Sequence, residues 1–194
     1  MRRLIQSAAL LIMLMCSTVC FAGQAETITE GADLTTINKM TICLPYYTKM
    51  IEEEPTTDEL LKAIAEAGKK AKGYEVMSYN DLAREIKADT AIDIRRLPIP
   101  ESKKVYKEYV SHYADAYLFV TIANNSRVNM FVSVHKADTH ELLYDFRVEG
   151  GKENSSKTLR NYQMLAEKFY EAFGAAKVKQ IKKARNEDDD EEDY

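Results

Sequence analysis

The run Ala116-Tyr117-Leu118-Phe119-Val120-Thr121-Ile122 is almost wholly apolar and rich in β-branched and aromatic residues. Such a run is typical of a strand buried on both faces at the centre of a sheet. Asn124-Asn125-Ser126-Arg127 follows, and asparagine favours turns because it tolerates left-handed backbone. The stretch from 114 to 151 therefore begins with a central strand and a turn.

Two alternating segments complete this stretch. Residues 128–135 place Val128, Met130, Val132 and Val134 on one face and polar or aromatic side chains on the other. After a second turn at 136–140, Leu142, Tyr144, Phe146 and Val148 alternate in the same way, and Gly150-Gly151 ends the pattern. Strict alternation indicates half-buried strands, so the sequence predicts a three-stranded antiparallel meander.

The elements around the meander predict an α/β fold. Strand Lys39–Leu44 stops at Pro45, and Thr56 with Glu59 forms a capping box for a helix that we expect to end at Gly73. The remaining expected elements are a strand at 74–77, a helix capped by Ser78, a packed loop with one helical turn at 89–100, a helix at 102–113 and a helix starting near 155 or 156. We expect an α+β sandwich with a mixed sheet of about five strands and helices on its faces.

Residues 1–22 have the pattern of a signal peptide. Arg2 and Arg3 precede an apolar core, and Cys20-Phe21-Ala22 suits cleavage before Gly23, with a second possible cut before Glu26. A retained anchor is the alternative, because residues 4–22 are just long enough to span a bilayer. Neither Cys16 nor Cys20 follows a good lipidation pattern. Each alternative predicts an exported, periplasmic or envelope-associated chain.

The remaining chain divides by charge and polarity. Residues 23–36 are polar and predict an extended leader, 37–178 a single domain, and 179–194 a charged, disordered tail. Seven of the last eight residues are acidic, and without them the exported chain has 25 basic and 24 acidic residues. This balance gives no electrostatic reason to expect nucleic-acid binding. We expect the tail to aid solubility, with weak calcium binding as the less favoured alternative.

No catalytic or metal-binding pattern is present. His112, His135 and His140 lack the i, i+4 spacing of a zinc pair, and His135, Asp138 and His140 are better explained as turn residues than as a metal cluster. Glu52, Glu53 and Glu54 are adjacent and predict a solvated loop. Cys43, the one cysteine beyond residue 22, predicts a buried small hydrophobe. We expect no enzyme, no cofactor, no metal site and no catalytic residue.

Tyrosine supplies the candidate contact residues. Tyr106, Tyr109 and Tyr113 share one side of a helix, where core packing is favoured over a contact surface. Tyr46 and Tyr47 lie beyond the end of a strand, the position where open α/β sheets bind ligands. The loop of Tyr46 and Tyr47 is the first place to test for binding.

Three short motifs carry a family resemblance that covers about residues 37–174. They are Leu44-Pro45-Tyr46 at a strand end, Tyr113-Ala114-Asp115 before the central strand, and Ala137-Asp138-Thr139-His140-Glu141 in a meander turn. The chain resembles the envelope α/β domain of the TolB amino-terminal domain, the curli-secretion lipoproteins and the activator LpoB. In that group the turn commonly contains a glycine, which is missing here. The resemblance implies a secreted, non-enzymatic domain that binds other envelope proteins, and it transfers no catalytic residue.

The predicted function is an exported binding or assembly module of the bacterial cell envelope. Its partner would be an envelope protein or a second copy, and it would meet the membrane only through an uncleaved signal or through that partner. The alternative is a periplasmic small-molecule or lipid-binding protein. That alternative requires a cavity on the order of several hundred Å³ between sheet and helices.

Overall fold

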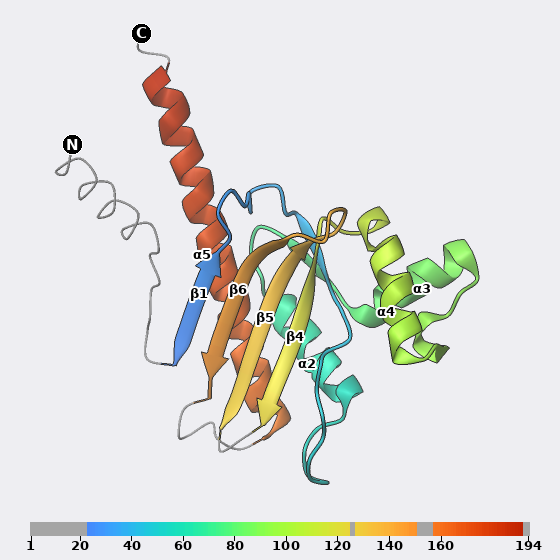
Figure 1. Ribbon diagram of the computed structural model, residues 1–194. Coiled ribbons are helices and arrows are strands. Elements are labelled where there is room, and N and C mark those ends of the chain that lie inside the picture. The colour runs from blue at the N-terminus through green and yellow to red at the C-terminus, as the bar shows by residue number, and fades with distance from the viewer. Residues whose placement is uncertain (1–22, 125–126, 151–156, 192–194) are drawn as a thin grey trace, which may run out of the picture.

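The computed structural model describes residues 23–124, 127–150 and 157–191, which form a mixed sheet with helices on both faces (Figure 1). The sheet has six strands in the order β1-β6-β5-β4-β2-β3. The strands are β1 (Gln24–Ile28), β2 (Lys39–Ile42), β3 (Glu75–Met77), β4 (Ala116–Asn124), β5 (Val128–Lys136) and β6 (Leu142–Glu149). The helices are α2 (Thr57–Gly68), α3 (Tyr79–Thr90), α4 (Ile99–Tyr109) and α5 (Leu159–Glu191), with single 3-10 turns at Ile94–Arg96 and Val110–His112. The predicted fold class is confirmed, with one strand more than expected.

The predicted meander is confirmed in its strand pairing. β4, β5 and β6 are antiparallel neighbours, and Val120 pairs with Val132, which pairs with Phe146. On the other side of β4 the sheet becomes parallel, because β2 pairs in parallel with both β4 and β3. The alternating valines of β5 are buried, as their spacing predicts.

The expected extended leader contains a strand of the sheet. Residues 24–28 form β1, which pairs antiparallel with β6. The Glu149 amide donates to the Gly23 carbonyl at 2.7 Å, and the Tyr144 hydroxyl donates to the Glu26 carboxylate at 2.5 Å. An extended polar segment satisfies its backbone groups by pairing with an open sheet edge. The domain therefore includes residue 23 onward, and the expected signal peptide lies outside the described residues.

The capping box of α2 is present as predicted, but the helix ends at Gly68 rather than near Gly73. Gly68 is part of the helix and meets the sheet closely. A Cβ atom built on it would lie 2.7 Å from Val76 Cγ1 and 3.0 Å from Tyr170 Cζ. This glycine therefore permits close packing of α2 against β3 and α5.

Helix α5 corrects the expected tail. The stripe Tyr162, Leu165, Phe169 and Phe173 is buried as predicted. The helix continues to Glu191, so residues 179–191 are helical rather than disordered. Gln180, beyond the expected domain end, accepts a hydrogen bond from the Leu34 amide at 2.7 Å and donates to the Ala32 carbonyl at 2.9 Å. Residues 175–186 are mostly Ala, Lys, Gln and Arg, which are strong helix formers.

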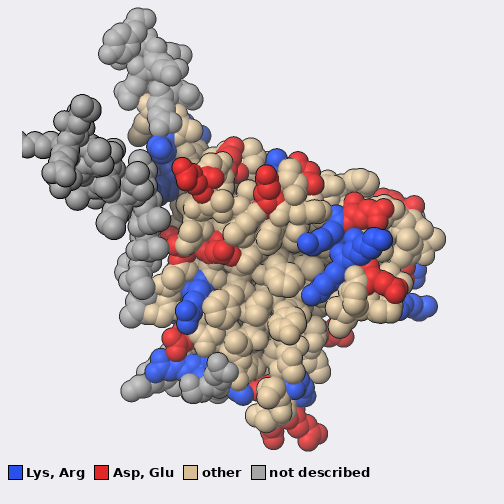
Figure 2. All heavy atoms as spheres, viewed as in Figure 1, with Lys and Arg blue, Asp and Glu red and all other residues tan. Residues whose placement is uncertain are grey.

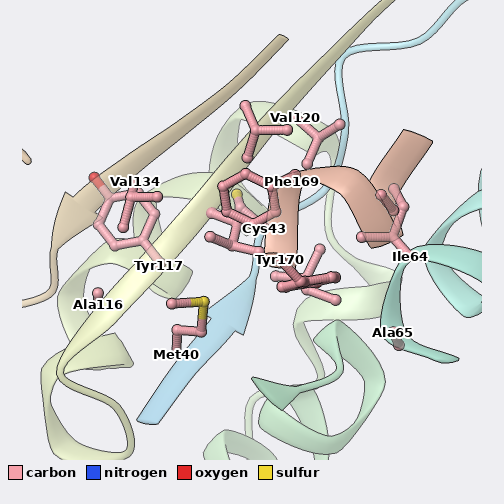
Figure 3. Close-up of a cluster of buried hydrophobic side chains, with 14 of the residues drawn as sticks. Met40, Cys43, Ile64, Ala65, Ala116, Tyr117, Val120, Val134, Phe169 and Tyr170 are labelled. Carbon is pink, nitrogen blue, oxygen red and sulfur yellow. The ribbon is translucent and has the colours of Figure 1, made fainter. Parts of the chain in front are cut away.

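The helices divide unequally between the two faces of the sheet. α2 and α5 pack on one face, where Val120, Val134, Phe169 and Ile64 all belong to the main core (Figure 3). α3 and α4 cover the opposite face only near β2 and β4, where Tyr106 packs edge-on against Tyr117 at 6.0 Å between ring centroids. The part of this second face formed by β5, β6 and β1 carries no helix among the described residues (Figure 1).

No helix in the described part of the chain is both long enough and apolar enough to cross a bilayer.

Candidate interaction surface

The loop from Leu44 to Pro55 leaves the end of β2 and continues briefly as part of the sheet. The Tyr46 amide donates to the Val120 carbonyl at 2.8 Å, and the Ile122 amide donates to the Tyr46 carbonyl at 3.0 Å. Tyr46 is 64% exposed. Tyr47 instead turns inward, donates its hydroxyl to the Pro55 carbonyl at 2.9 Å and packs edge-on against Tyr162. The two tyrosines therefore differ in role, and of the two Tyr46 is presented to solvent.

Glu54 anchors this loop, which corrects the prediction that Glu52, Glu53 and Glu54 are all solvated. Its side chain is buried, and the residue is only 2% exposed. One carboxylate oxygen lies 2.6 Å from Lys157 Nζ, and the other accepts the Met50 amide at 2.8 Å and the Tyr47 hydroxyl at 3.3 Å. Burial alone would raise the pKa of Glu54, but the hydrogen bonds from Lys157 and Met50 outweigh it and lower the pKa to about 2. The carboxylate is charged at neutral pH and fixes the loop to the start of α5.

The anchored loop exposes large apolar side chains at its tip. Met50 is 67% exposed and Ile51 is 51% exposed. Leu159, at the start of α5, is partly exposed and lines the same hollow as Glu52 and Glu53. Residues 49–59 hold five acidic residues and a single basic one, Lys49. We call Met50, Ile51 and the exposed acids Glu52, Glu53, Asp58 and Glu59 the acidic tip.

A row of side chains crosses the open face of the sheet and ends at Tyr46. Thr121, Phe131 and Arg147 pair across β4, β5 and β6, and Tyr46 forms a parallel bridge with Thr121. Directly paired residues point to the same side of a sheet. The Arg147 guanidinium lies 5.3 Å from the centre of the Phe131 ring. The row thus joins the open face to the loop.

A second cation covers another aromatic ring on this face. Lys103 Nζ of α4 lies 5.0 Å from the centre of the Phe119 ring. Within the described residues neither Lys103 nor Arg147 makes an ion pair with a carboxylate. In Figures 1 and 2 α5 lies behind the strands, so the viewer faces this side, and uncharged atoms occupy most of its middle. The open face is an aromatic surface with charge at its margins.

The tyrosine stripe of α4 is mainly core. Tyr106 is fully buried, and it stacks on Tyr79 at 6.1 Å between centroids. Tyr109 and Tyr113 are half-buried, and the Tyr113 hydroxyl donates to Asp89. The favoured core interpretation holds for Tyr106, with the other two at the rim.

His135, His140 and Cys43 pack against other residues of the fold. His135 stacks on Tyr117 at 5.2 Å between centroids, and His140 meets the same ring edge-on at 5.8 Å. Across the described ranges no three His, Cys, Asp or Glu side chains are grouped as a metal site. Cys43 is buried as predicted, and burial raises the pKa of its thiol to about 11. A thiol with a raised pKa is a poor nucleophile.

A groove between α2 and α5 has a partly apolar lining. Its volume is about 550 Å³, and its lining combines Ala67, Ala71, Gly174, Ala175 and Val178 with Lys70, Lys72, Glu167, Glu171 and Tyr170. A second hollow of about 600 Å³ lies between the loop after β1 and the β5–β6 hairpin, and charged or polar residues form much of its wall. Both are surface depressions with exposed residues in their walls.

Comparison with known proteins finds solved structures that are similar to this chain at low sequence identity. No family model and no curated protein match the sequence. Among solved structures, the chain is similar to the PelC dodecamer from Paraburkholderia phytofirmans, with 10% identity, a TM-score of 0.46, and coverage of 75% of this chain and 91% of that one. It is also similar to lipoprotein GNA1162 from Neisseria meningitidis, with 15% identity, a TM-score of 0.38, and coverage of 75% and 99%.

A third similar structure is the hypothetical protein CT253 from Chlamydia trachomatis, with 9% identity, a TM-score of 0.36, and coverage of 74% and 95%. None of these three proteins is TolB, a curli-secretion lipoprotein or LpoB. The resemblance to that specific group stays a prediction.

Proposed function

We propose that the chain is an exported, non-enzymatic binding or assembly module of the bacterial cell envelope that acts through protein–protein contacts. The acidic tip and the adjoining Tyr46 are its main contact residues. The sequence pattern of residues 1–22 supports export. The partner is an envelope protein or a second copy of the chain, and no nucleic acid or cofactor is involved.

One observation carries this proposal. A buried, charged carboxylate, Glu54, holds a surface loop in a shape that exposes Met50 and Ile51. Burying a charge is costly unless it is paired, and exposing two large apolar side chains gains nothing for the free protein. A rigid loop that presents apolar side chains lowers the entropic cost of binding a partner. Protein contact is therefore the use that this arrangement fits best.

The alternative function, binding of a small molecule or lipid, has one observation in its favour. The groove between α2 and α5 has the volume of many ligand pockets, about 550 Å³. Most of its apolar lining residues, however, have small side chains, and several of its lining residues are exposed to solvent. The groove suits insertion of side chains from another protein better than enclosure of a ligand.

In-cell crosslinking followed by affinity purification and mass spectrometry tests the proposal. The test variant is the double substitution Met50→Ser with Ile51→Ser, because both residues are exposed and their loss leaves the core intact. The matched control is Ile92→Ser with Ile99→Ser, which likewise removes two exposed large apolar side chains, but from the α3–α4 region.

We expect the wild type and the control to recover the same crosslinked protein, and the tip variant to lose it at equal abundance. Tyr46→Ala should weaken the same crosslink. Equal recovery by the tip variant and the wild type would show that the loop is not the contact site, and the proposed function would then lose its support.

A further inference from the structure

The two ends of the molecule are complementary in shape. The acidic tip projects at the end where α2 begins, and the groove lies where α2 ends, about 18 Å further along that helix. Figure 1 shows the loop at the lower end of the molecule and the C-terminal part of α5 at the upper end. The loop end of the molecule therefore carries apolar projections, and the groove, with its partly apolar lining, lies beside the middle of α5, away from that end.

The two ends are also complementary in charge. The tip carries Glu52, Glu53, Asp58 and Glu59. Near the groove, Lys72 is exposed, and the next turns of α5 carry the exposed basic residues Lys179, Lys182, Lys183 and Arg185. From residue 172 to residue 186 the sequence contains no acid, and the acidic run begins only at Glu187. The groove lining is balanced in charge, with Lys70 and Lys72 against Glu167 and Glu171, whereas the stretch of α5 just beyond the groove is basic where the tip is acidic.

The groove itself has room for the tip. Val178, one of its lining residues, is 49% exposed, and Ala71, Gly174 and Ala175 line it with small side chains or none. A volume of about 550 Å³ accepts an organic ligand of moderate size, so it can hold two aliphatic side chains. Insertion of Met50 and Ile51 would remove apolar surface on both partners from water.

We propose that the acidic tip of one copy inserts into the α2–α5 groove of a second copy, giving a head-to-tail assembly. This inference rests on the proposed function, because it names the partner of the same loop. A tip-to-tip contact would bring like charges together and is disfavoured. A contact between two different surface patches is heterologous, so copies add in one direction and form a ring or an open chain. The contact is small, and we expect association to be weak and concentration-dependent.

Cysteine crosslinking between separately prepared variants tests this geometry. Full-length genes carrying Ile51→Cys and Val178→Cys are expressed separately, with Cys16 and Cys20 replaced by serine. Both new cysteines replace exposed residues, so folding should be retained, and Cys43 is buried and unreactive. The matched control mixes the Ile51→Cys protein with an Ile99→Cys protein, whose cysteine is also exposed but lies on α4.

Under mild oxidation we expect at least a tenfold excess of mixed disulfide in the Ile51→Cys and Val178→Cys mixture over the control mixture. The double variant in one chain should give a ladder of multimers or one closed ring. Raising the salt concentration should reduce crosslinking, because the charged residues at both surfaces are exposed. Ala175→Glu, which adds a bulky acid to the groove lining, should abolish crosslinking.

Crosslinking no higher than in the control mixture would overturn the head-to-tail assembly. If the tip variant then still lost an envelope protein in cells, the proposed function would stand without this inference. If the tip variant lost no partner, both would fail.

Discussion

Replacing Glu54 by glutamine should destabilise the protein and change how its stability depends on pH. The substituted amide would keep the shape of the side chain and an oxygen for the Met50 amide, but it would remove the charge that lies 2.6 Å from Lys157. Lowering a carboxyl pKa from 4.5 to about 2 corresponds to roughly 3 kcal/mol of stability at neutral pH. Lys157 is partly exposed and can turn to solvent, so we expect a loss of about 2 to 3 kcal/mol.

The sign of the pH dependence follows from the lowered pKa. The stabilisation from Glu54 is fully present above its unfolded pKa of 4.5 and is lost as the pH falls through the folded value of about 2. Urea unfolding of wild type and Glu54→Gln at pH 7 should therefore differ by about 2 to 3 kcal/mol, and the difference should shrink between pH 4.5 and pH 2.

Glu53→Gln is the matched control, because the neighbouring Glu53 is exposed. It should change the free energy of unfolding by less than about 0.5 kcal/mol. A Glu54→Gln protein as stable as the control at pH 7, or a difference that does not shrink in acid, would refute the role assigned to this carboxylate.

Four further substitutions test the packing of the fold by thermal or urea denaturation. Gly68→Ala should destabilise the protein by about 1 to 3 kcal/mol, because the Cβ of the new alanine would clash with Val76. The control Gly174→Ala has space for a Cβ and should be neutral or stabilising by up to about 1 kcal/mol. Equal effects of the two substitutions would contradict the close packing of α2. Ala91→Gly should stabilise the protein by about 0.5 to 1 kcal/mol, because Ala91 ends α3 with a φ of 62°, a left-handed conformation that glycine adopts more readily than alanine. A loss of stability would argue against that left-handed cap. Lys177→Met should lower the free energy of unfolding by about 1 to 3 kcal/mol, because the carbonyls of Ile37 and Gly73 lose their buried hydrogen-bond donor. An unchanged melting temperature would show that water replaces the lysine as donor.

Local periodicity was sufficient to predict the centre of the fold. The alternating residues of β5 and residues 144–148 of β6 lie on the faces that their spacing indicates, and Thr56 and Glu59 form the predicted capping box. Leu142 is the exception, because a register shift in β6 pairs it with His135 and buries Leu143 instead. These features depend on residues close in sequence. The burial of Glu54 could not be predicted in this way, because its partner Lys157 is about a hundred residues away and both belong to polar segments.

The ends of the domain were predicted less well, for two different reasons. β1 has no hydrophobic alternation, since it is an edge strand whose pairing with β6 comes from backbone hydrogen bonds. The continuation of α5 was missed because its charged composition was interpreted as disorder, although Gln180 ties the helix to residues 32–34. Of the candidate contact residues, Tyr46 was identified from its position after a strand. The exposure of Met50 and Ile51 depends on the Glu54 anchor and has no signal in the sequence.

The place of β1 in the sheet has a consequence for the order of folding. Of the elements that the structure describes, β1 is the first to emerge during synthesis, but its partner β6 ends at Glu149. The strand must therefore remain unpaired until most of the domain has been made, while it exposes free backbone groups. Glu26, in the middle of β1, adds a charge that opposes pairing with other chains during this interval. Only when β6 is in place can the Tyr144 hydroxyl donate to that carboxylate. Glu26 thus disfavours pairing of the newly made strand with other chains, and later it accepts a hydrogen bond that holds β1 on the sheet.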